Sequence, residues 1–349
     1  MNIIDNRYNI DKELGIGQFG KTKLAYDIIS KKYVAIKIIY NKIAEEKILR
    51  EIKIIQQCKH PHIIKYENYF INNGIYHIVM EYVEYGELFD HVCKNTFNNI
   101  QKKNIIAQLI SAIEYCHGNL IVHGDIKLEN ILISDMNKPI IKLIDFGFSN
   151  YINLDEPYNN TCGSLQYTAP EIIQSFTSFN PMKTDVWSLG VVIYCIINKS
   201  FPWRDEHLIP DITTYNYMKC DNDNDLIDLF KKIFVPPDKR INLSEIKNHQ
   251  WLVGYVIDSN LPNRLPITNI DSFIINKLIN LDFNIDTVIK LLNEGGNSIE
   301  VSIYHLLLDK YRENKIENKI ENNNNTSKIV LNKKHKKCEN KRKCFSWCY

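Results

Sequence analysis

Hydrophobic and polar positions follow two different periods along the chain. From residue 8 to about residue 40, apolar and polar residues alternate and glycines interrupt the alternation, which predicts short strands joined by turns. The segments 21–26 and 33–39 are the clearest of these strands. From residue 44 to about residue 251, apolar residues recur at the three- and four-residue spacing of helices. The pattern therefore predicts a small β-rich part followed by a larger, mainly helical part.

A second change in pattern follows the large helical part. A loop with two prolines leads into three short segments of helical spacing, broken near residues 282–284 and at Gly295-Gly296. The last stretch is repetitive and rich in Asn, then basic with several cysteines, a composition that predicts disorder. The predicted divisions are 8–252 for a large domain, 253–269 for a linker, 270–312 for a small helical domain and 313–349 for a tail.

Composition and charge exclude several classes of protein. The formal net charge of the 349 residues is only +2, so no overall field draws the chain to nucleic acid. No apolar run reaches bilayer length, and the charged start does not resemble a signal peptide. The nine cysteines are scattered, which favours reduced thiols and a cytoplasmic protein, with the nucleus as the alternative. Residues 328–349 hold eight Lys or Arg and one Glu; we expect a solvated tail, with nuclear import or membrane contact as alternatives.

A glycine loop supplies the first candidate chemistry. The pattern GxGxxG spans Gly15 to Gly20, and glycine lets backbone N–H groups approach phosphate oxygens closely. A dinucleotide-binding fold would need a helix next and an acidic residue about 20 positions on. A strand follows instead, and residues 28–44 contain no Asp or Glu. The loop therefore joins two strands and is predicted to cover phosphates, with Leu14, Gly15, Ile16, Gly17, Gln18, Phe19 and Gly20 as nucleotide-binding residues.

A lysine and a glutamate form a predicted ion pair beside this loop. Ala35 and Lys37 share one face of the second strand because side chains alternate along a strand. In the helix predicted for residues 44–58, Glu51 lies on the inward apolar stripe. An inward carboxylate is costly unless it is paired, so Lys37–Glu51 is the expected pair. An exposed glutamate on the edge of the helix is the alternative.

The strongest motifs lie in the middle of the chain. HGDIKLEN spans residues 123–130, Asp145-Phe146-Gly147 follows, and Ala169-Pro170-Glu171 comes later. With the glycine loop and the strand lysine, this ordered set resembles the eukaryotic protein kinases over roughly residues 8–251. The resemblance implies an α+β, two-lobed kinase fold, with an antiparallel sheet plus a helix in the N-lobe and a mainly helical C-lobe.

The resemblance also implies the reaction and the roles in it. The chain is expected to transfer the γ-phosphoryl group of ATP, with Mg²⁺ or Mn²⁺ as a substitute, to Ser or Thr of protein substrates. Asp125 is the expected base, and Lys127 is expected to neutralise the γ-phosphate and marks the Ser/Thr class. Asn130 and Asp145 offer hard oxygen ligands for the metal. The alternative is a pseudokinase that acts as a scaffold.

Further positions carry over by the same resemblance. The adenine pocket is expected to involve Thr22, Ala35, Met80, Glu81, Val83, Glu87 and Leu132. Thr22 stands where most kinases have valine. Asp185, at the start of an apolar helix, is expected to brace the catalytic loop, and Glu171 is expected to pair with Arg240.

The segment from Asp145 to Glu171 resembles the AMP-activated/sucrose-non-fermenting kinases. In that family the activating threonine lies two residues before the cysteine of a Cys-Gly-Ser element; here Asn160 holds that position and Thr161 follows it. Gly124 replaces the arginine that normally binds the loop phosphate. The two changes together predict an activity that does not depend on phosphorylation of this loop. Substitution of Thr161 for the missing site is the alternative.

Substrate and domain expectations complete the prediction. Glu87, Asp90 and Glu129 form an acidic rim that favours basic residues N-terminal to the acceptor, unless it is an ordinary solvated face. Ser164 is expected to contact Asp125 and Lys127, with Leu165 shaping the adjacent pocket. Residues 270–312 resemble the small ubiquitin-associated-like domain of the same family, a three-helix fold that tunes the kinase. A purely stabilising extension is the alternative, and we expect a monomer.

Overall fold

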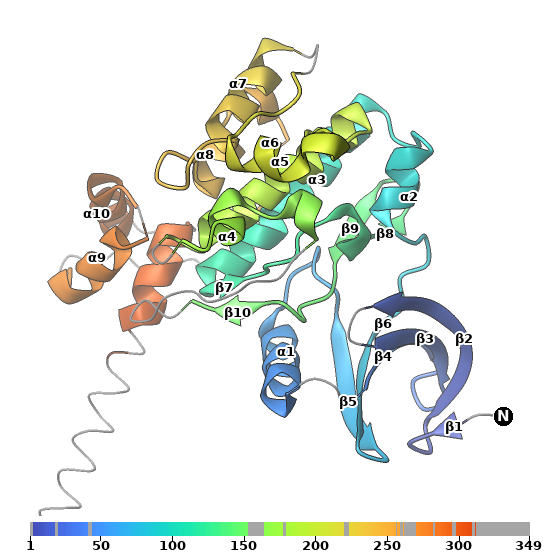
Figure 1. Cartoon of the computed structure of the whole chain (residues 1–349). Coiled ribbons are helices and arrows are strands. Elements are labelled where there is room, and N and C mark those ends of the chain that lie inside the picture. Colours follow the sequence, from blue (N-terminus) through green and yellow to red (C-terminus); the bar gives the residue numbers. More distant parts are fainter. Residues whose placement is uncertain are drawn as a thin grey trace, which may run out of the picture.

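The structure is a computed structural model that describes most of the chain as two lobes and a C-terminal group of helices (Figure 1). The described residues are 3–17, 20–40, 44–152, 164–176, 179–219, 223–255, 257–258, 261, 270–281, 283–294, 298–308 and 311.

The N-lobe is a curled antiparallel sheet of six strands in the order β1-β2-β3-β4-β6-β5. Alternation of apolar residues buries Val34, Ile36 and Ile38 on one face of β4. The strands are β1 (Ile3–Ile4), β2 (Tyr8–Gly17), β3 (Gly20–Asp27), β4 (Lys32–Ile39), β5 (Tyr66–Asn72) and β6 (Ile75–Glu81).

The hairpin of β5 and β6 lies inside the part of the chain where the sequence pattern predicted mainly helices. Its turn residues Asn73 and Gly74 both have positive φ, 51° and 75°, as a tight hairpin turn with the strands' own twist requires. The Asn-Gly pair between two alternating segments was the signal that could have revealed it. The hairpin completes the sheet that roofs the site.

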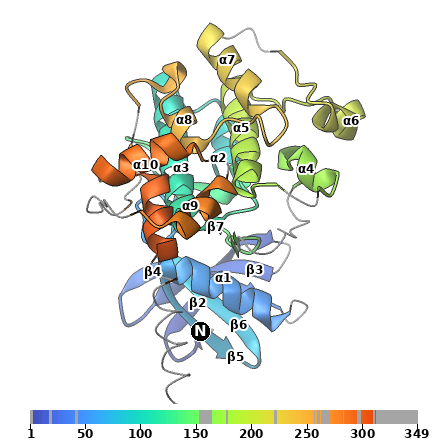
Figure 2. The same ribbon diagram turned by 90° about the vertical axis from the view of Figure 1, so that its left-hand side faces the viewer.

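Helix α1 (Glu45–Gln57) packs on this sheet (Figure 2) through one stripe of its surface. Its buried residues include Ile48, Ile52 and Ile55, and Glu51 lies among them, as the sequence predicted. A carboxylate is thereby delivered to the inner face of the lobe, where only a cation can compensate its burial.

The C-lobe is built around two long helices, α3 (Asn99–Gly118) and α5 (Met182–Asn198), which are buried almost all round. Asn98 caps α3 because its side chain accepts a hydrogen bond from Gln101 N. In return, the Gln101 side chain accepts one from Asn98 N. Shorter helices surround them: α2 (Leu88–Cys93), α4 (Pro170–Ile173), α6 (Leu208–Thr213), α7 (Asn224–Ile233) and α8 (Leu243–Lys247).

Short strands and 3₁₀ turns shape the inner edge of this lobe. Two antiparallel pairs join β7 (Ile121–Val122) to β10 (Asn150–Tyr151) and β8 (Ile131–Asp135) to β9 (Ile140–Leu143). The 3₁₀ turns are η1 (Leu128–Asn130), η2 (Leu165–Tyr167), η3 (Asp205–His207) and η4 (Gln250–Leu252).

Three helical stretches follow the C-lobe: α9 (Ser272–Ile279), α10 (Ile285–Glu294) and residues 299–308. Their apolar residues share one core cluster with the C-lobe, and Asn180 Nδ2 donates to Leu281 O at 2.7 Å. Of the predicted breaks, Asp282 and Gly295-Gly296 lie outside the described residues.

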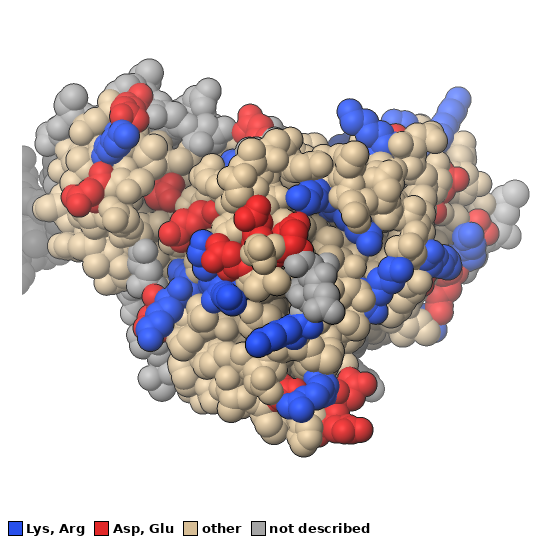
Figure 3. All heavy atoms as spheres, turned by 90° about the horizontal axis from the view of Figure 1, so that it is seen from above, with Lys and Arg blue, Asp and Glu red and all other residues tan. Residues whose placement is uncertain are grey.

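Surface and composition agree with the near-zero net charge. Acidic and basic side chains are interspersed over the face of the C-lobe in Figure 3. Among the described residues, Cys58, Cys93, Cys116 and Cys195 are free thiols. No helix within the described ranges has the length and apolarity to cross a membrane.

Candidate active site

A cleft of about 400 Å³ lies between the lobes and collects most of the predicted nucleotide-binding residues. Ile16 does not line it and is 70% exposed, while Gln18 and Phe19 lie outside the described residues. Lining residues that the sequence reasoning missed are Ile55, Ile64, Glu84, Gly86 and Ile144. The predicted residues that do line it are Leu14, Gly15, Gly17, Gly20, Thr22, Ala35, Lys37, Glu51, Met80, Glu81, Val83, Glu87, Leu132 and Asp145.

The three glycines of the loop are needed for different reasons. A Cβ at Gly20 would lie 1.9 Å from Ile38 O on the neighbouring strand, so packing within the sheet demands a glycine there. At Gly15 a Cβ would meet nothing within 4 Å, and at Gly17 only Gly20 O at 3.9 Å. Protein packing does not require glycine at these two positions, and their bare backbone leaves room for a ligand to approach.

Lys37 is held between two carboxylates. Its Nζ lies 2.6 Å from Glu51 Oε1, as predicted, and 2.7 Å from Asp145 Oδ1, which the sequence pattern did not reveal. Burial opposes charge on Lys37, but the two carboxylates outweigh it and raise its pKa. Burial also opposes ionisation of Asp145, yet Lys37 outweighs it and lowers that pKa, whereas burial raises the pKa of Glu51. The lysine and Asp145 therefore stay charged.

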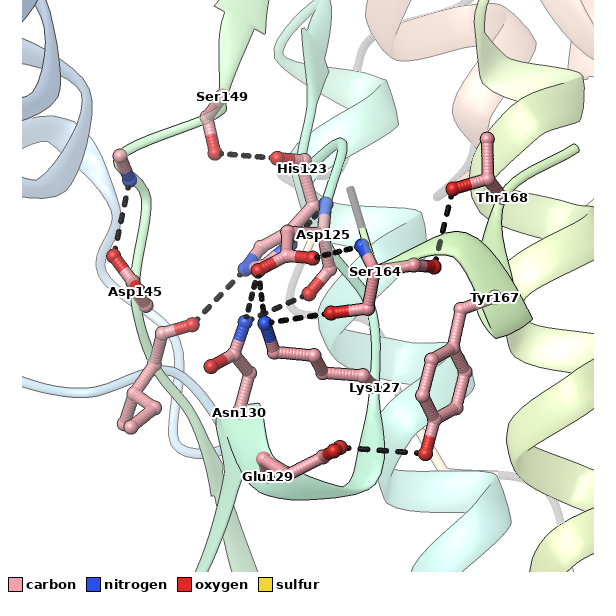
Figure 4. Close-up of polar contacts among 12 residues, drawn as sticks. His123, Asp125, Lys127, Glu129, Asn130, Asp145, Ser149, Ser164, Tyr167 and Thr168 are labelled. Atoms are coloured by element: carbon pink, nitrogen blue, oxygen red, sulfur yellow. Dashed lines mark hydrogen bonds and ion pairs between the residues drawn. The ribbon is translucent and has the colours of Figure 1, made fainter. Parts of the chain in front are cut away.

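Side chains of residues 123–130, the predicted catalytic loop, surround Asp125, which is 4% exposed (Figure 4). Lys127 Nζ donates to Asp125 Oδ2 at 2.7 Å and to Ser164 Oγ at 3.1 Å. Asn130 Nδ2 donates to Asp125 O and Oδ2, each at 2.8 Å. Ser164 N approaches the other carboxylate oxygen, Oδ1, at 3.4 Å. Asp125 is thus fixed mainly through Oδ2, and Oδ1 is the less engaged oxygen.

Asp185 supports the backbone of this loop from below. It accepts hydrogen bonds from His123 N and Gly124 N at 2.9 Å each and contacts His117 Nε2 at 2.9 Å. Burial opposes its ionisation, but the His117 contact and the other donors lower its pKa. Asp185 lies within the first turn of α5, because the helix begins at Met182 rather than after Asp185.

Gly124 adopts φ of 78°, in the left-handed region. A glycine takes this conformation without the steric cost that an L side chain incurs. The residue that replaces the family's arginine therefore fits the backbone of the loop without strain.

Two side-chain oxygens, one on Asn130 and one on Asp145, suit a divalent cation. Asn130 uses its amide nitrogen on Asp125, and Asp145 uses Oδ1 on Lys37 and on Gly147 N. Within the described residues, Asn130 Oδ1 and Asp145 Oδ2 accept no hydrogen bond from a side chain or a backbone amide. Oxygen donors of this kind are the ligands that magnesium prefers, so the residues fit the metal.

The predicted structural pair is fully buried. Arg240 contacts both oxygens of Glu171, at 2.5 and 2.9 Å, and neither side chain is exposed. This pair lies behind the site and fixes Glu171 to the C-lobe. Glu171 is the last residue of the segment 145–171, which we call the activation segment.

The predicted acidic rim is only partly one surface. Glu87 and Asp90 both line the cleft, and burial together with Asp90 and Glu129 raises the pKa of Glu87. Glu129 accepts from Tyr167 OH at 3.3 Å, and Leu165 is 41% exposed nearby on η2. Asn160 and Thr161 lie outside the described residues.

Comparison with known proteins agrees with this geometry. The protein kinase domain family matches residues 8–252. The chain is 37% identical over 89% of its length to the SNF1-related protein kinase catalytic subunit alpha KIN12 of Arabidopsis thaliana. It is 36% identical over 86% of its length to the serine/threonine protein kinase OSK3 of Oryza sativa, and 36% identical over 71% to the human NUAK family SNF1-like kinase 1. The chain spans 65%, 62% and 39% of the lengths of these relatives. The chain belongs to the protein kinase family, and the relatives named here include kinases related to SNF1.

Proposed function

We propose that this chain is an active serine/threonine protein kinase that uses ATP and Mg²⁺. The proposal depends on two sets of contacts. Lys37 lies between two carboxylates in the cleft, and Asp125 is held by Lys127 and Asn130. A pseudokinase commonly lacks one of these groups, and none is missing here.

The contacts define a division of labour in phosphoryl transfer. Asp125 orients the substrate hydroxyl through its less engaged Oδ1 and accepts the proton as the oxygen attacks the γ-phosphorus. The bond to the bridging oxygen breaks, and ADP leaves with the electron pair. Lys127 lies beside Asp125 and neutralises the transferred group, while Lys37 holds the α/β-phosphates. Asn130 and Asp145 would hold the magnesium, which supplies neutralisation of phosphate charge.

Labelled ATP and a basic peptide test the proposal directly. We expect transfer to Ser or Thr by the purified chain and a loss of about a thousandfold in Asp125→Ala. Asp205→Ala, which removes an exposed carboxylate, is the matched control and should be unaffected. Equal transfer by the wild type and Asp125→Ala would overturn the role of Asp125. Nucleotide binding without transfer by the wild type would favour the scaffold.

We also propose that activity does not require phosphate on the activation segment. Support comes from the catalytic loop, whose backbone at residues 123 and 124 is held by Asp185 without a side chain at position 124. Phosphatase treatment should leave activity unchanged, as should Thr161→Ala. A large fall in activity that tracks phosphate on Thr161 by mass spectrometry would contradict this.

The substrate class follows from the acidic side chains near the cleft. We propose that Glu87, Asp90 and Glu129 favour basic residues N-terminal to the acceptor. Glu87 and Asp90 line the cleft, and Glu129 is near enough to contribute to the raised pKa of Glu87. A peptide library should show selection of Arg or Lys there, and Glu87→Gln should weaken that selection. No basic preference would leave these acids as a solvated face.

The helices after residue 270 are proposed to form a ubiquitin-associated-like domain that tunes the kinase. The support is their shared core with the C-lobe and the contact between Asn180 and Leu281. Truncation after Pro262 should change both activity and melting temperature. We further propose a cytoplasmic monomer.

A further inference from the structure

The chain that follows η4 runs along one side of α3. We call the described residues 253–255, 257–258 and 261 the linker strap. Near its start, Lys103 Nζ donates to Trp251 O at 2.8 Å and lies 5.5 Å from the ring centre of Tyr255. Near its end, Leu261 is buried on Gly118, where a Cβ would come within 2.4 Å of Leu261 Cδ2. The strap is therefore attached at both ends of the 20-residue helix α3.

Ser111, between these two ends, joins the strap to a third element. Its fully buried Oγ lies 2.6 Å from Asp258 O in the strap and 3.0 Å from His60 Nε2, in the turn after α1. A carbonyl oxygen only accepts, so the single hydroxyl proton goes to Asp258 O. His60 Nε2 must then donate to Ser111 Oγ.

The other ring nitrogen of His60 agrees with this assignment. Nδ1 accepts a hydrogen bond from His62 N at 3.2 Å, which requires that it carry no proton. Burial lowers the pKa of His60 to about 4, so the neutral ring is the form present near neutral pH. A single tautomer of His60 is therefore compatible with all three hydrogen bonds: to Ser111 Oγ, from the backbone N–H of His62, and from Ser111 to the strap carbonyl.

The turn that contains His60, residues 58–62, lies between the two elements that hold Lys37. It follows directly on α1, which carries Glu51. On its other side, His62 O accepts from Leu143 N at 2.8 Å, and Ile64 N donates to Leu143 O at 3.0 Å. Leu143 ends β9, two residues before Asp145. The turn thus connects the two backbone segments that carry Glu51 and Asp145, the carboxylates in contact with Lys37.

We propose that Ser111 is a positioning residue that couples the linker strap, through His60, to the Lys37 site. The strap is then part of the catalytic unit rather than a passive connection to the C-terminal helices. This inference rests on the proposed kinase function, because its readout is the handling of ATP.

Ser111→Ala in the full chain is the first test. The variant leaves the buried N–H of His60 without its acceptor, and we expect about a tenfold fall in kcat/KM for ATP. The fall should come mainly from KM for ATP, with KM for the peptide unchanged. Ser111→Thr keeps the hydroxyl and should restore the wild-type value. Ser302→Ala is the matched control, because it removes another buried hydroxyl that makes no hydrogen bond among the described residues.

Leu261→Ala tests the strap without touching Ser111. Loosening the strap should raise KM for ATP in the same way. The double variant with Ser111→Ala should be no worse than the more impaired single variant, since both changes interrupt one path. Additive losses would overturn the coupling. If Ser111→Ala does not fold, Leu261→Ala decides the question by itself, and an unchanged KM for ATP would overturn the proposal.

Affinity for a fluorescent ATP analogue separates this inference from the proposed function. If the wild type binds the analogue but transfers no phosphate, the kinase function fails, and weaker binding by Ser111→Ala still supports the coupling. If the wild type is active and Ser111→Ala matches it in both affinity and KM, the coupling is wrong and the kinase function stands.

Discussion

Two largely buried clusters in this chain each pair a basic side chain with carboxylates. They are similar in composition and differ in what surrounds them. Lys37 with Glu51 and Asp145 lies at the cleft, where the side chains are 12%, 8% and 29% exposed. Arg240 with Glu171 is 0% exposed on both sides. Arg240 also donates to Val235 O, at 3.0 Å, and to Lys183 O, at 2.6 Å.

The two clusters differ in whether their charged groups can still contact a ligand. Arg240 spends its planar set of donors on Glu171 and on backbone carbonyls, so this pair fixes the fold. At the cleft, Asp145 keeps an oxygen and the lysine faces an open volume. A buried ion pair alone is weak grounds for a functional site. The open side and the spare oxygens of the Lys37 cluster support the proposed binding of ATP and Mg²⁺ at the cleft.

Lys37→Met should have the largest effect on phosphotransfer activity. A small effect would contradict the difference drawn between the two clusters. We expect phosphotransfer to fall about a thousandfold, because the phosphate contact is lost. The melting temperature should fall less than for Arg240→Met, since water reaches Asp145 from the cleft. A kinase assay beside a thermal melt measures both. Retained activity would mean that Lys37 holds the fold and not the nucleotide.

Arg240→Met should show the opposite profile. Removing one partner of a fully buried pair leaves Glu171 uncompensated, and we expect a loss of about 3–5 kcal/mol in unfolding free energy. Urea denaturation measures it. Activity per folded molecule, determined at low temperature, should stay near wild type. A variant that folds normally but is inactive would assign Arg240 to the reaction instead.

The sequence pattern predicted contacting residues correctly where they lie on a regular helix and a nearby strand. Glu51 was found because a helical stripe places it inward beside Lys37. The contact of Lys37 with Asp145 was not found from the pattern, because it joins residues 108 positions apart. The same limit hid Ile55, Ile64 and Ile144 in the cleft, which read as ordinary core positions until the lobes are brought together.

Gly124→Arg tests whether a residue in the catalytic loop contributes to stability rather than to activity. An L side chain in the left-handed region costs about 1–2 kcal/mol, so we expect the melting temperature to fall by a few degrees. Activity should change little, because Asp185 still holds the backbone amides. The control is Gly74→Ala, which meets the same kind of backbone strain at φ of 75° in the turn between β5 and β6. A strong gain of activity after phosphorylation of Thr161 in Gly124→Arg would show that the arginine alone restores activation by loop phosphorylation.

The smallest effect concerns the carboxylate of Glu87, which lines the cleft. The pKa of Glu87 is raised, so this group takes up a proton at a higher pH than an ordinary glutamate. Attraction to a basic peptide is complete above that pKa and is lost as the pH falls through it. As the pH is lowered from neutral, we expect affinity for a basic peptide to fall about threefold, and the fall should begin at a higher pH than an ordinary glutamate would produce. Fluorescence anisotropy measures this, and Glu87→Gln should abolish the pH dependence. An identical pH response of a neutral peptide would rule out Glu87 as the cause.

The contact between Lys37 and Asp145 also bears on how the molecule folds. Closing a loop of 108 residues carries an entropic cost that local helix and hairpin contacts do not. The sheet and α1 can bring Lys37 to Glu51 early, whereas Asp145 arrives only when both lobes have formed and met. Phosphotransfer therefore reports on the finished molecule, and in refolding it should recover after the circular dichroism signal of the helices.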